Sequence, residues 1–386
     1  MSTTNLTKRL LCILEVLLLV ITTQTNAWSL ITGSTKSAPW TLGIRGFDRT
    51  YYGLAQNNSI PDPVEVAMIV GVKPCMMAPK LVWKLVWRVH GALLPIFHLG
   101  DLAKPIDSKQ SLKVLWCKAI ASMDKQSKVY DDRWTYDTLP SPSRWLLRVL
   151  PTRLFPRLHH ANIEARTAYL NSIIEGEIKQ VLSEHQHNNS SMVNIRLISL
   201  GAGYDVRCSR LLSRYNTQHG ANLHVDAYEL DLDHVVLSKR KILDRIKRRR
   251  PQALHPQLIS VDLNDLDDGA VTKKTLYEII TQPAPNQQPV HTIFILEGVM
   301  IYLNHGVPSG LLKLLADMVR LSHGGTASLC FADRLENVPG GNRDAATQEM
   351  ARCGWELVDF CPKPGLARHM GLSRLIPMNH TFVPTF

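Results

Sequence analysis

Residues 197–211 read Leu197-Ile-Ser-Leu-Gly-Ala-Gly-Tyr-Asp-Val-Arg-Cys-Ser-Arg-Leu211. Four of the five residues from 197 to 201 are apolar or Gly, which predicts a short buried strand. The turn Gly201-Ala202-Gly203 ends this strand, and a helical run follows from Asp205 with its apolar residues on one side. A strand that turns through glycines into a helix brings backbone N–H groups close to a nucleotide-like ligand. A Gly-x-Gly sequence alone is common in loops, so its meaning depends on the segments that follow.

Three later strand candidates finish with a carboxylate. These candidates span residues 223–230, 258–263 and 292–297, and they are associated with Asp231, Asp262 and Glu297. The alternation of strands and helices predicts an α/β fold with a mostly parallel, Rossmann-like sheet and helices on both faces. Ligands of such sheets bind beyond the carboxyl ends of the strands. Each carboxylate taken singly is explained as a helix cap or a solvated loop residue, but three in succession favour a nucleoside site.

The spacing distinguishes between nucleoside cofactors. Asp231 lies 28 residues after Gly203, whereas dinucleotide sites place their acidic residue about 20 residues after the glycines. Val206 stands where a dinucleotide fold has its third glycine. Both observations argue against a nicotinamide oxidoreductase. S-adenosylmethionine suits the site, because its ribose hydroxyls bind a carboxylate and its sulfonium and amine tolerate nearby acids.

The ordered motifs resemble one family. Leu200-Gly-Ala-Gly-Tyr-Asp205, Tyr228-Glu-Leu-Asp231, Val261-Asp-Leu263 and Glu297-Gly-Val-Met-Ile-Tyr-Leu303 are together similar to the leucine carboxyl methyltransferase family, over residues 111–355. The resemblance implies a class I methyltransferase fold and S-adenosylmethionine as methyl donor. It implies these donor-binding residues: Arg166 for the methionine carboxylate, Gly201 and Gly203 for close backbone approach, Asp231 for the ribose, Asp262 and Leu263 for the adenine, and Glu297 near the methionine end. One departure is that Tyr130-Asp-Asp-Arg133 stands where some members have Lys-Asp-Pro.

The implied reaction is O-methylation of a carboxylate on a small molecule or a protein. A carboxylate is already ionised near neutral pH and needs no general base, so no catalytic residue is assigned. A hydroxyl acceptor would need a base, for which His291, His305 and His323 are available; Tyr302 either faces the acceptor or packs in the core. The alternative is a non-catalytic protein that keeps the fold as a binding module. The seven cysteines form no Cys-x-x-Cys pair, so we expect no metal.

The N-terminal region is typical of a targeting leader. Lys8 and Arg9 precede an apolar run and small residues, which predicts a signal peptide over residues 1–27, with an uncleaved anchor as the alternative. Residues 28–60 are rich in hydroxyl and basic side chains and poor in acids, like a transit segment. Together they indicate the secretory pathway, ending in either a plastid or secretion.

A helical extension is expected over residues 61–110, before a methyltransferase domain over residues 111–386. Within the extension, residues 80–90 place Lys80, Lys84 and Arg88 on one helix face beside tryptophans. This face either rests on an anionic membrane surface or covers the following domain.

The formal net charge of +11 is concentrated in residues 239–250. No aromatic residue interleaves these charges, so the run disfavours a nucleic-acid partner. The simpler interpretation is a solvated helix face with Ile242, Leu243 and Ile246 packed beneath it.

Overall fold

The fold is seen in a computed structural model that describes residues 106–377, except 126, 130–131, 140–143, 146, 149–156, 188–191, 219–222, 268, 323–324 and 364–367. All described residues belong to one of two compact units, which comprises Leu94–Thr152 and Arg157–Phe386. The expected signal peptide, the transit segment 28–60 and the basic face at 80–90 lie outside the described residues. No helix within the described part is both long and apolar enough to cross a membrane.

A seven-stranded sheet forms the centre, in the order β3-β2-β1-β4-β5-β7-β6. The first five strands in this order are parallel, β7 is antiparallel to β5, and β6 is antiparallel to β7. The strands are β1 (Val193–Leu200), β2 (Leu223–Asp231), β3 (Gln257–Ser260), β4 (Val290–Glu297), β5 (Thr326–Asp333), β6 (Trp355–Lys363) and β7 (Arg368–Leu375). The predicted α/β, Rossmann-like, mostly parallel fold is confirmed.

Strand β1 is longer than its apolar residues predict. It begins at Val193, and all eight of its residues are buried, as expected for a central parallel strand covered on both faces. Polar residues in its first half interrupt the apolar run, so the apolar pattern does not predict where the strand begins. Arg196 is 1% exposed, and its guanidinium donates to the Asp226 carboxylate and to the carbonyl oxygens of Ile279 and Gln282. A buried arginine satisfied in this way is compatible with the core.

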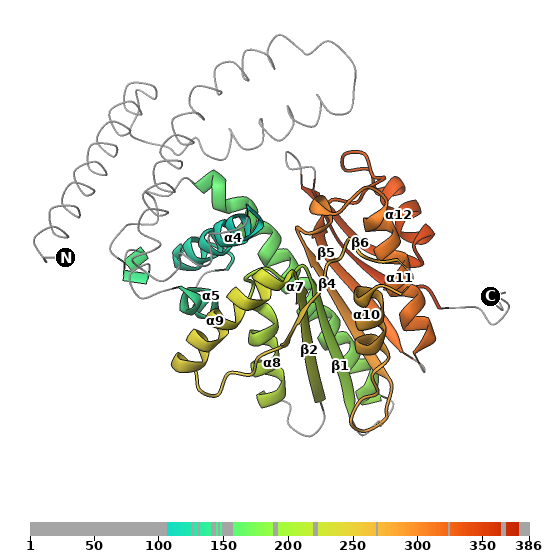
Figure 1. Ribbon diagram of the computed structural model, residues 1–386, viewed down its shortest axis with the longest axis horizontal. Coiled ribbons are helices and arrows are strands. Elements are labelled where there is room, and N and C mark those ends of the chain that lie inside the picture. Colours follow the sequence, from blue (N-terminus) through green and yellow to red (C-terminus); the bar gives the residue numbers. More distant parts are fainter. Residues whose placement is uncertain are drawn as a thin grey trace, which may run out of the picture. The chain divides into compact units, whose positions relative to one another are not determined.

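Helices cover both faces of the sheet (Figure 1). One face packs against α10 (Val271–Thr281), α11 (Val307–Leu321) and α12 (Arg343–Arg352), and the other packs against α7 (Arg157–His187) and α8 (Arg207–Gln218). Helices α4 (Ile106–Met123) and α5 (Arg133–Thr138) precede them, α9 (Asp233–Arg249) follows β2, and the short 3-10 helix η4 (Met300–Tyr302) follows β4.

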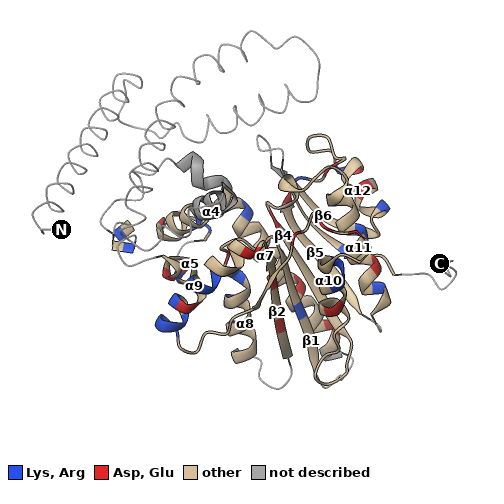
Figure 2. Ribbon diagram, in the orientation of Figure 1, with Lys and Arg blue, Asp and Glu red and all other residues tan. Residues whose placement is uncertain are grey.

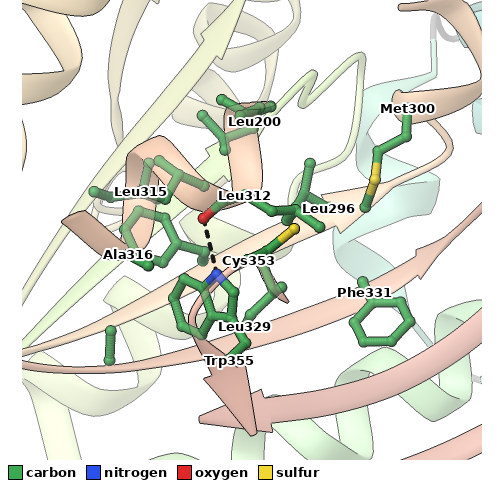
Figure 3. Packing of buried hydrophobic residues seen from close by; sticks show 14 of the residues in the cluster. Leu200, Leu296, Met300, Leu312, Leu315, Ala316, Leu329, Phe331, Cys353 and Trp355 are labelled. Carbon is green, nitrogen blue, oxygen red and sulfur yellow. Dashed lines mark hydrogen bonds between the residues drawn. The ribbon is translucent and has the colours of Figure 1, made fainter. Parts of the chain in front are cut away.

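Trp355 lies in the hydrophobic core between the sheet and helices α10, α11 and α12. Its ring is fully buried, meets Phe294 edge to face, and donates its indole N–H to the Leu312 carbonyl at 2.8 Å (Figure 3). The hydrogen bond satisfies the polar atom that burial of an indole would otherwise leave without a partner.

The basic run of α9 differs in part from its prediction. Ile242, Leu243 and Ile246 are buried as expected, and the ribbon of the helix carries several Lys and Arg positions (Figure 2). Lys239, however, is 2% exposed and pairs with Glu229, also 2% exposed, at 2.6 Å. The prediction of a solvated face is therefore wrong for Lys239.

The last arginines of α9 hold α5. Arg245 donates to the carbonyl of Thr138, and Arg249 donates to those of Asp137 and Leu139. Arg250 pairs with the Asp137 carboxylate at 2.9 Å. Two of the eight basic residues in 239–250 thus bind the last backbone carbonyls of a neighbouring helix, where cations are favourable.

Candidate functional site

The strand order reverses between β1 and β4, and ligands of open α/β sheets bind outside the carboxyl ends of the strands at such a point. Leu200 is in register with both Leu230 of β2 and Leu296 of β4, so the three strands end at one level. The residues that follow these ends are the glycine turn, Asp231 and Glu297. The structure therefore brings these sequence-predicted positions to one edge of the sheet.

The glycine turn needs glycine for two reasons. Gly201 and Gly203 have φ values of 62° and 51°, which side chains rarely tolerate. A Cβ on Gly201 would also lie 2.3 Å from the Cγ2 atom of Val299 in the loop after β4. The turn is therefore shaped by close packing between the loops after β1 and β4.

Asp231 faces this turn. Its carboxylate accepts the Gly203 N–H at 2.7 Å and the Leu232 N–H at 2.8 Å. Burial raises the pKa of Asp231, against the opposing effect of these hydrogen bonds. The residue ties the end of β2 to the turn.

Side-chain periodicity explains where Glu297 points. Ile293 and Ile295 of β4 pack on the α7 and α8 side, and Glu297 continues this alternation. On α7, Arg166 lies one turn before Leu170, and Ile174 follows at the same spacing, so all three share the face that meets the sheet. The two periodicities bring Arg166 and Glu297 together.

Three cations surround Glu297. The Nε atom of Arg166 lies 2.7 Å from its Oε1 atom, while Lys118 Nζ and Arg207 Nη2 lie 3.0 and 2.9 Å from its Oε2 atom. Burial by itself would raise the pKa of Glu297, but Lys118, Arg166 and Arg207 outweigh it and lower the pKa to about 2. Glu297 is therefore ionised throughout the physiological range.

Asp205 completes this buried group, which we call the charge cluster: Lys118, Arg166, Asp205, Arg207 and Glu297. Lys118 Nζ is 2.9 Å and Arg207 Nη2 is 3.3 Å from the Asp205 Oδ2 atom. Despite burial, Arg207 and Lys118 hold the pKa of Asp205 well below its usual range. With three cations and two carboxylates, the cluster has one positive charge in excess and suits an anionic ligand group.

Lys118 and Arg207 were missed by the sequence analysis. Lys118 stands alone in the buried stretch 115–121 of α4, and an isolated charge in an apolar helix was the signal available. Arg207 follows the glycine turn closely and is 4% exposed.

Two other predicted residues lie differently from expectation. Strand β3 ends at Ser260, so Asp262 does not end a strand; its side chain is exposed and accepts the Asn264 N–H at 2.9 Å. The prediction of three strand-terminal carboxylates is therefore wrong for Asp262. Leu263 is buried in the core beside it. An adenine-binding role for this pair stays a prediction.

Asp333, a further residue missed in the sequence, ends β5 and is fully buried. Its carboxylate accepts the backbone N–H groups of Val299 and Met300 at 2.5 and 2.8 Å, and that of Arg334 at 2.8 Å. Burial raises the pKa of Asp333, which the three hydrogen bonds oppose. The residue fixes the loop that follows Glu297.

The candidates for a base are not gathered at the cluster. His291 is in β4 at the opposite end from Glu297 and contacts Thr326 and Ser328, and His305 is almost fully exposed. His323 lies outside the described residues, and Tyr302 is 57% exposed in η4. In the region that departs from Lys-Asp-Pro, Asp132 caps α5. No group of three or more His, Cys, Asp or Glu side chains among the described residues is placed to hold a metal ion.

Comparison with solved structures finds class I methyltransferases at low overall similarity. Magnesium protoporphyrin IX methyltransferase from Synechocystis PCC 6803 with bound S-adenosylmethionine is 9% identical, with a TM-score of 0.33 over 57% of this chain and 83% of that one. The trans-methyltransferase CalH with S-adenosylhomocysteine is 14% identical, with a TM-score of 0.29 over 71% and 92%. No curated protein sequence matches the chain.

The family model is decisive. The model described as "Leucine carboxyl methyltransferase" matches residues 111–316, more than half of the chain. This range contains the glycine turn, Asp231 and the whole charge cluster. The chain therefore belongs to the leucine carboxyl methyltransferase family and is an S-adenosylmethionine-dependent methyltransferase.

Proposed function

We propose that the enzyme methylates a carboxylate oxygen on a small molecule or a protein, with S-adenosylmethionine as donor. The observation that carries the donor site is the buried charge cluster at the ends of β1 and β4, and the carboxylate acceptor rests on the family match. The single excess positive charge of the cluster suits a carboxylate, and its ionised Glu297 suits an amine. The methionine portion of the donor has both groups.

In this proposal each predicted residue binds one part of the donor. Arg166 pairs with the methionine carboxylate. Its bond to Glu297 uses Nε, so the two terminal nitrogens of the guanidinium are not engaged in that bond and suit a bidentate contact. Glu297 accepts the methionine amine, and the glycine turn lies along the donor at Gly201 and Gly203.

The nucleoside end of the donor is assigned in the same way. Asp231 binds the ribose hydroxyls, and Leu263 with Asp262 borders the adenine. Asp231 already accepts two backbone N–H groups, and a carboxylate has lone pairs for further donors.

Bound donor supplies an electrophilic methyl group on a sulfonium. An acceptor carboxylate oxygen attacks that carbon in line with the departing sulfur; one C–O bond forms, and the C–S electron pair stays on sulfur. An ionised carboxylate has no proton to lose, so the protein contributes orientation and exclusion of water. This chemistry is consistent with histidines that lie away from the charge cluster.

Donor binding is tested with Asp231→Ala and Arg166→Ala in the full-length protein. Calorimetric titration should show loss of S-adenosylmethionine binding in both, with circular dichroism unchanged. Asp267→Ala removes an exposed carboxylate and is the matched control, which should bind like wild type. Unchanged affinity in the first two variants would remove the basis for the assigned site.

The acceptor is tested with methyl-labelled donor and an extract of the source organism, followed by separation into small molecules, protein and RNA. A carboxyl methyl ester releases labelled methanol in mild base, whereas an ether or a methylated nitrogen does not. Base-labile label in small molecules or protein supports the proposal. Donor binding without label transfer supports the binding-module alternative instead, and base-stable label excludes a carboxylate acceptor.

Location is part of the same proposal. The composition of residues 1–60 supports delivery through the secretory pathway to a plastid or to the outside of the cell. Residues 80–90 would then provide peripheral contact with an anionic membrane. A fluorescent protein fused behind residues 1–60 that stays in the cytosol would contradict the targeting.

A further inference from the structure

Arg207 is held on several sides at the start of α8. Its Nη2 atom is 2.9 Å from Glu297 Oε2 and 3.3 Å from Asp205 Oδ2, and its Nε donates to Asn171 Oδ1 at 2.8 Å. Its backbone N–H donates to Asp205 Oδ1 at 2.9 Å. The guanidinium is buried, so these contacts determine where it lies.

These contacts connect the segment that follows β1 with the end of β4. Arg207 belongs to the segment that continues the glycine turn after β1, and Glu297 ends β4. Lys118 shares the Oε2 atom of Glu297 with Arg207, whereas Arg166 contacts the Oε1 atom. Arg207 thus ties the β1 side of the site to the β4 carboxylate from the β1 side itself, while Lys118 of α4 bridges the same two carboxylates, Asp205 and Glu297.

We propose that Arg207 is a positioning residue for the methyl donor, which holds Glu297 ionised and oriented toward the donor amine without contacting the donor itself. The inference rests on the proposed function, in which Glu297 binds that amine. Because Arg207 acts through Glu297, its effect on donor binding must vanish when Glu297 is already neutral.

The charge around Glu297 leads to a pH signature. The groups that face it are Lys118 from α4, Arg166 from α7, and Arg207 and Asp205 from the segment after β1. An opposite charge at this distance lowers a carboxyl pKa, so loss of Arg207 raises the Glu297 pKa above its value of about 2. Glu297 then gains a proton as the pH falls toward 4.5, and donor affinity falls with it.

The experiment uses full-length Arg207→Met, Arg207→Gln, Arg207→Lys, Glu297→Gln and the double variant Arg207→Met/Glu297→Gln. Calorimetry measures S-adenosylmethionine affinity at pH 7.5, 6 and 4.5. Arg207→Met leaves Glu297 misoriented, and loss of the charge-assisted hydrogen bond from the donor amine to Glu297 predicts about 10- to 100-fold weaker binding at pH 7.5. Its affinity should fall severalfold further by pH 4.5 relative to wild type, a comparison that cancels the titration of the donor. Arg207→Lys restores a charge and should recover most of the affinity.

The double variant decides between acting through Glu297 and acting directly. Arg207→Met in the Glu297→Gln background should weaken binding less than twofold beyond Glu297→Gln alone. An independent loss of tenfold or more would mean that Arg207 contacts the donor or supports the fold, and would overturn the proposal. So would wild-type affinity for Arg207→Met at every pH.

Two controls keep the outcome interpretable. Thermal unfolding is measured for each variant, and if Arg207→Met does not fold, Arg207→Gln replaces it in the same cycle, since Gln keeps a donor while removing the charge. If the wild type does not bind S-adenosylmethionine, the proposed function itself fails, which is a different result from an unaltered Arg207 variant.

Discussion

Replacement of Lys239 by Met tests the buried ion pair with Glu229. Both side chains are 2% exposed, and the Nζ and Oε2 atoms are 2.6 Å apart. Removing one partner of such a pair leaves an uncompensated charge in the core and costs about 3–5 kcal/mol. For a domain of this size that corresponds to a fall in Tm of about 6–20 °C. Lys247→Met, on an exposed part of the same helix, should change stability by less than about 0.5 kcal/mol.

The pH dependence of Lys239→Met follows from Glu229. Burial already raises the pKa of Glu229 in the wild type, although Lys239 opposes the effect. Without Lys239 the folded-state pKa rises further above its unfolded value. In the variant, the contribution of protonated Glu229 to the free energy of unfolding is complete below the unfolded-state pKa of Glu229. That contribution is lost as the pH rises through the higher folded-state pKa. The difference from wild type should therefore be larger at pH 8 than at pH 5.5.

Urea unfolding followed by tryptophan fluorescence measures these free energies. Glu229→Met/Lys239→Met replaces the pair by apolar side chains and should recover most of the loss, because a well-packed apolar pair often matches a buried ion pair. A Lys239→Met variant within about 1 kcal/mol of wild type, or a double variant as unstable as the single one, would refute the reasoning.

Three further predictions concern the turn, the core and the half-buried His291. Gly201→Ala should lower the free energy of unfolding by about 1–3 kcal/mol because of its positive φ, and by more because the new Cβ would contact Val299. Adding Val299→Gly should recover part of this loss in urea unfolding. No recovery would contradict the contact. Trp355→Ala should cost about 3–5 kcal/mol in the same assay, whereas a loss below 1 kcal/mol would contradict its burial. Burial lowers the pKa of His291 to about 4, so the midpoint of its NMR titration should lie near that pH. Its contribution to the free energy of unfolding should fall as the pH drops from 6.5 toward 4. A titration midpoint near 6.5 would refute this prediction.

Local pattern was enough to predict much of the framework. The glycine turn after an apolar strand, the alternation of strands with helices and the fourfold spacing on α7 each depend on neighbours a few residues apart. Asp231 and Glu297 were found in this way, because strand ends follow from the alternation of strands and helices, whereas Arg166 came from the resemblance to the family. Where polar residues interrupt the pattern, as Arg196 does in β1, the prediction began the strand too late.

The sequence by itself determined the fold class, the glycine turn and the family of the enzyme. Only the tertiary structure decided which charged side chains share the site. Lys118 and Glu297 are 179 residues apart in the sequence. Lys239 lies in a run of basic residues, and nothing in that run predicts that Lys239 is buried. Whether a lysine is solvated or paired depends on burial and on partners from distant segments, since the same charge that is stable in water must be compensated in the core.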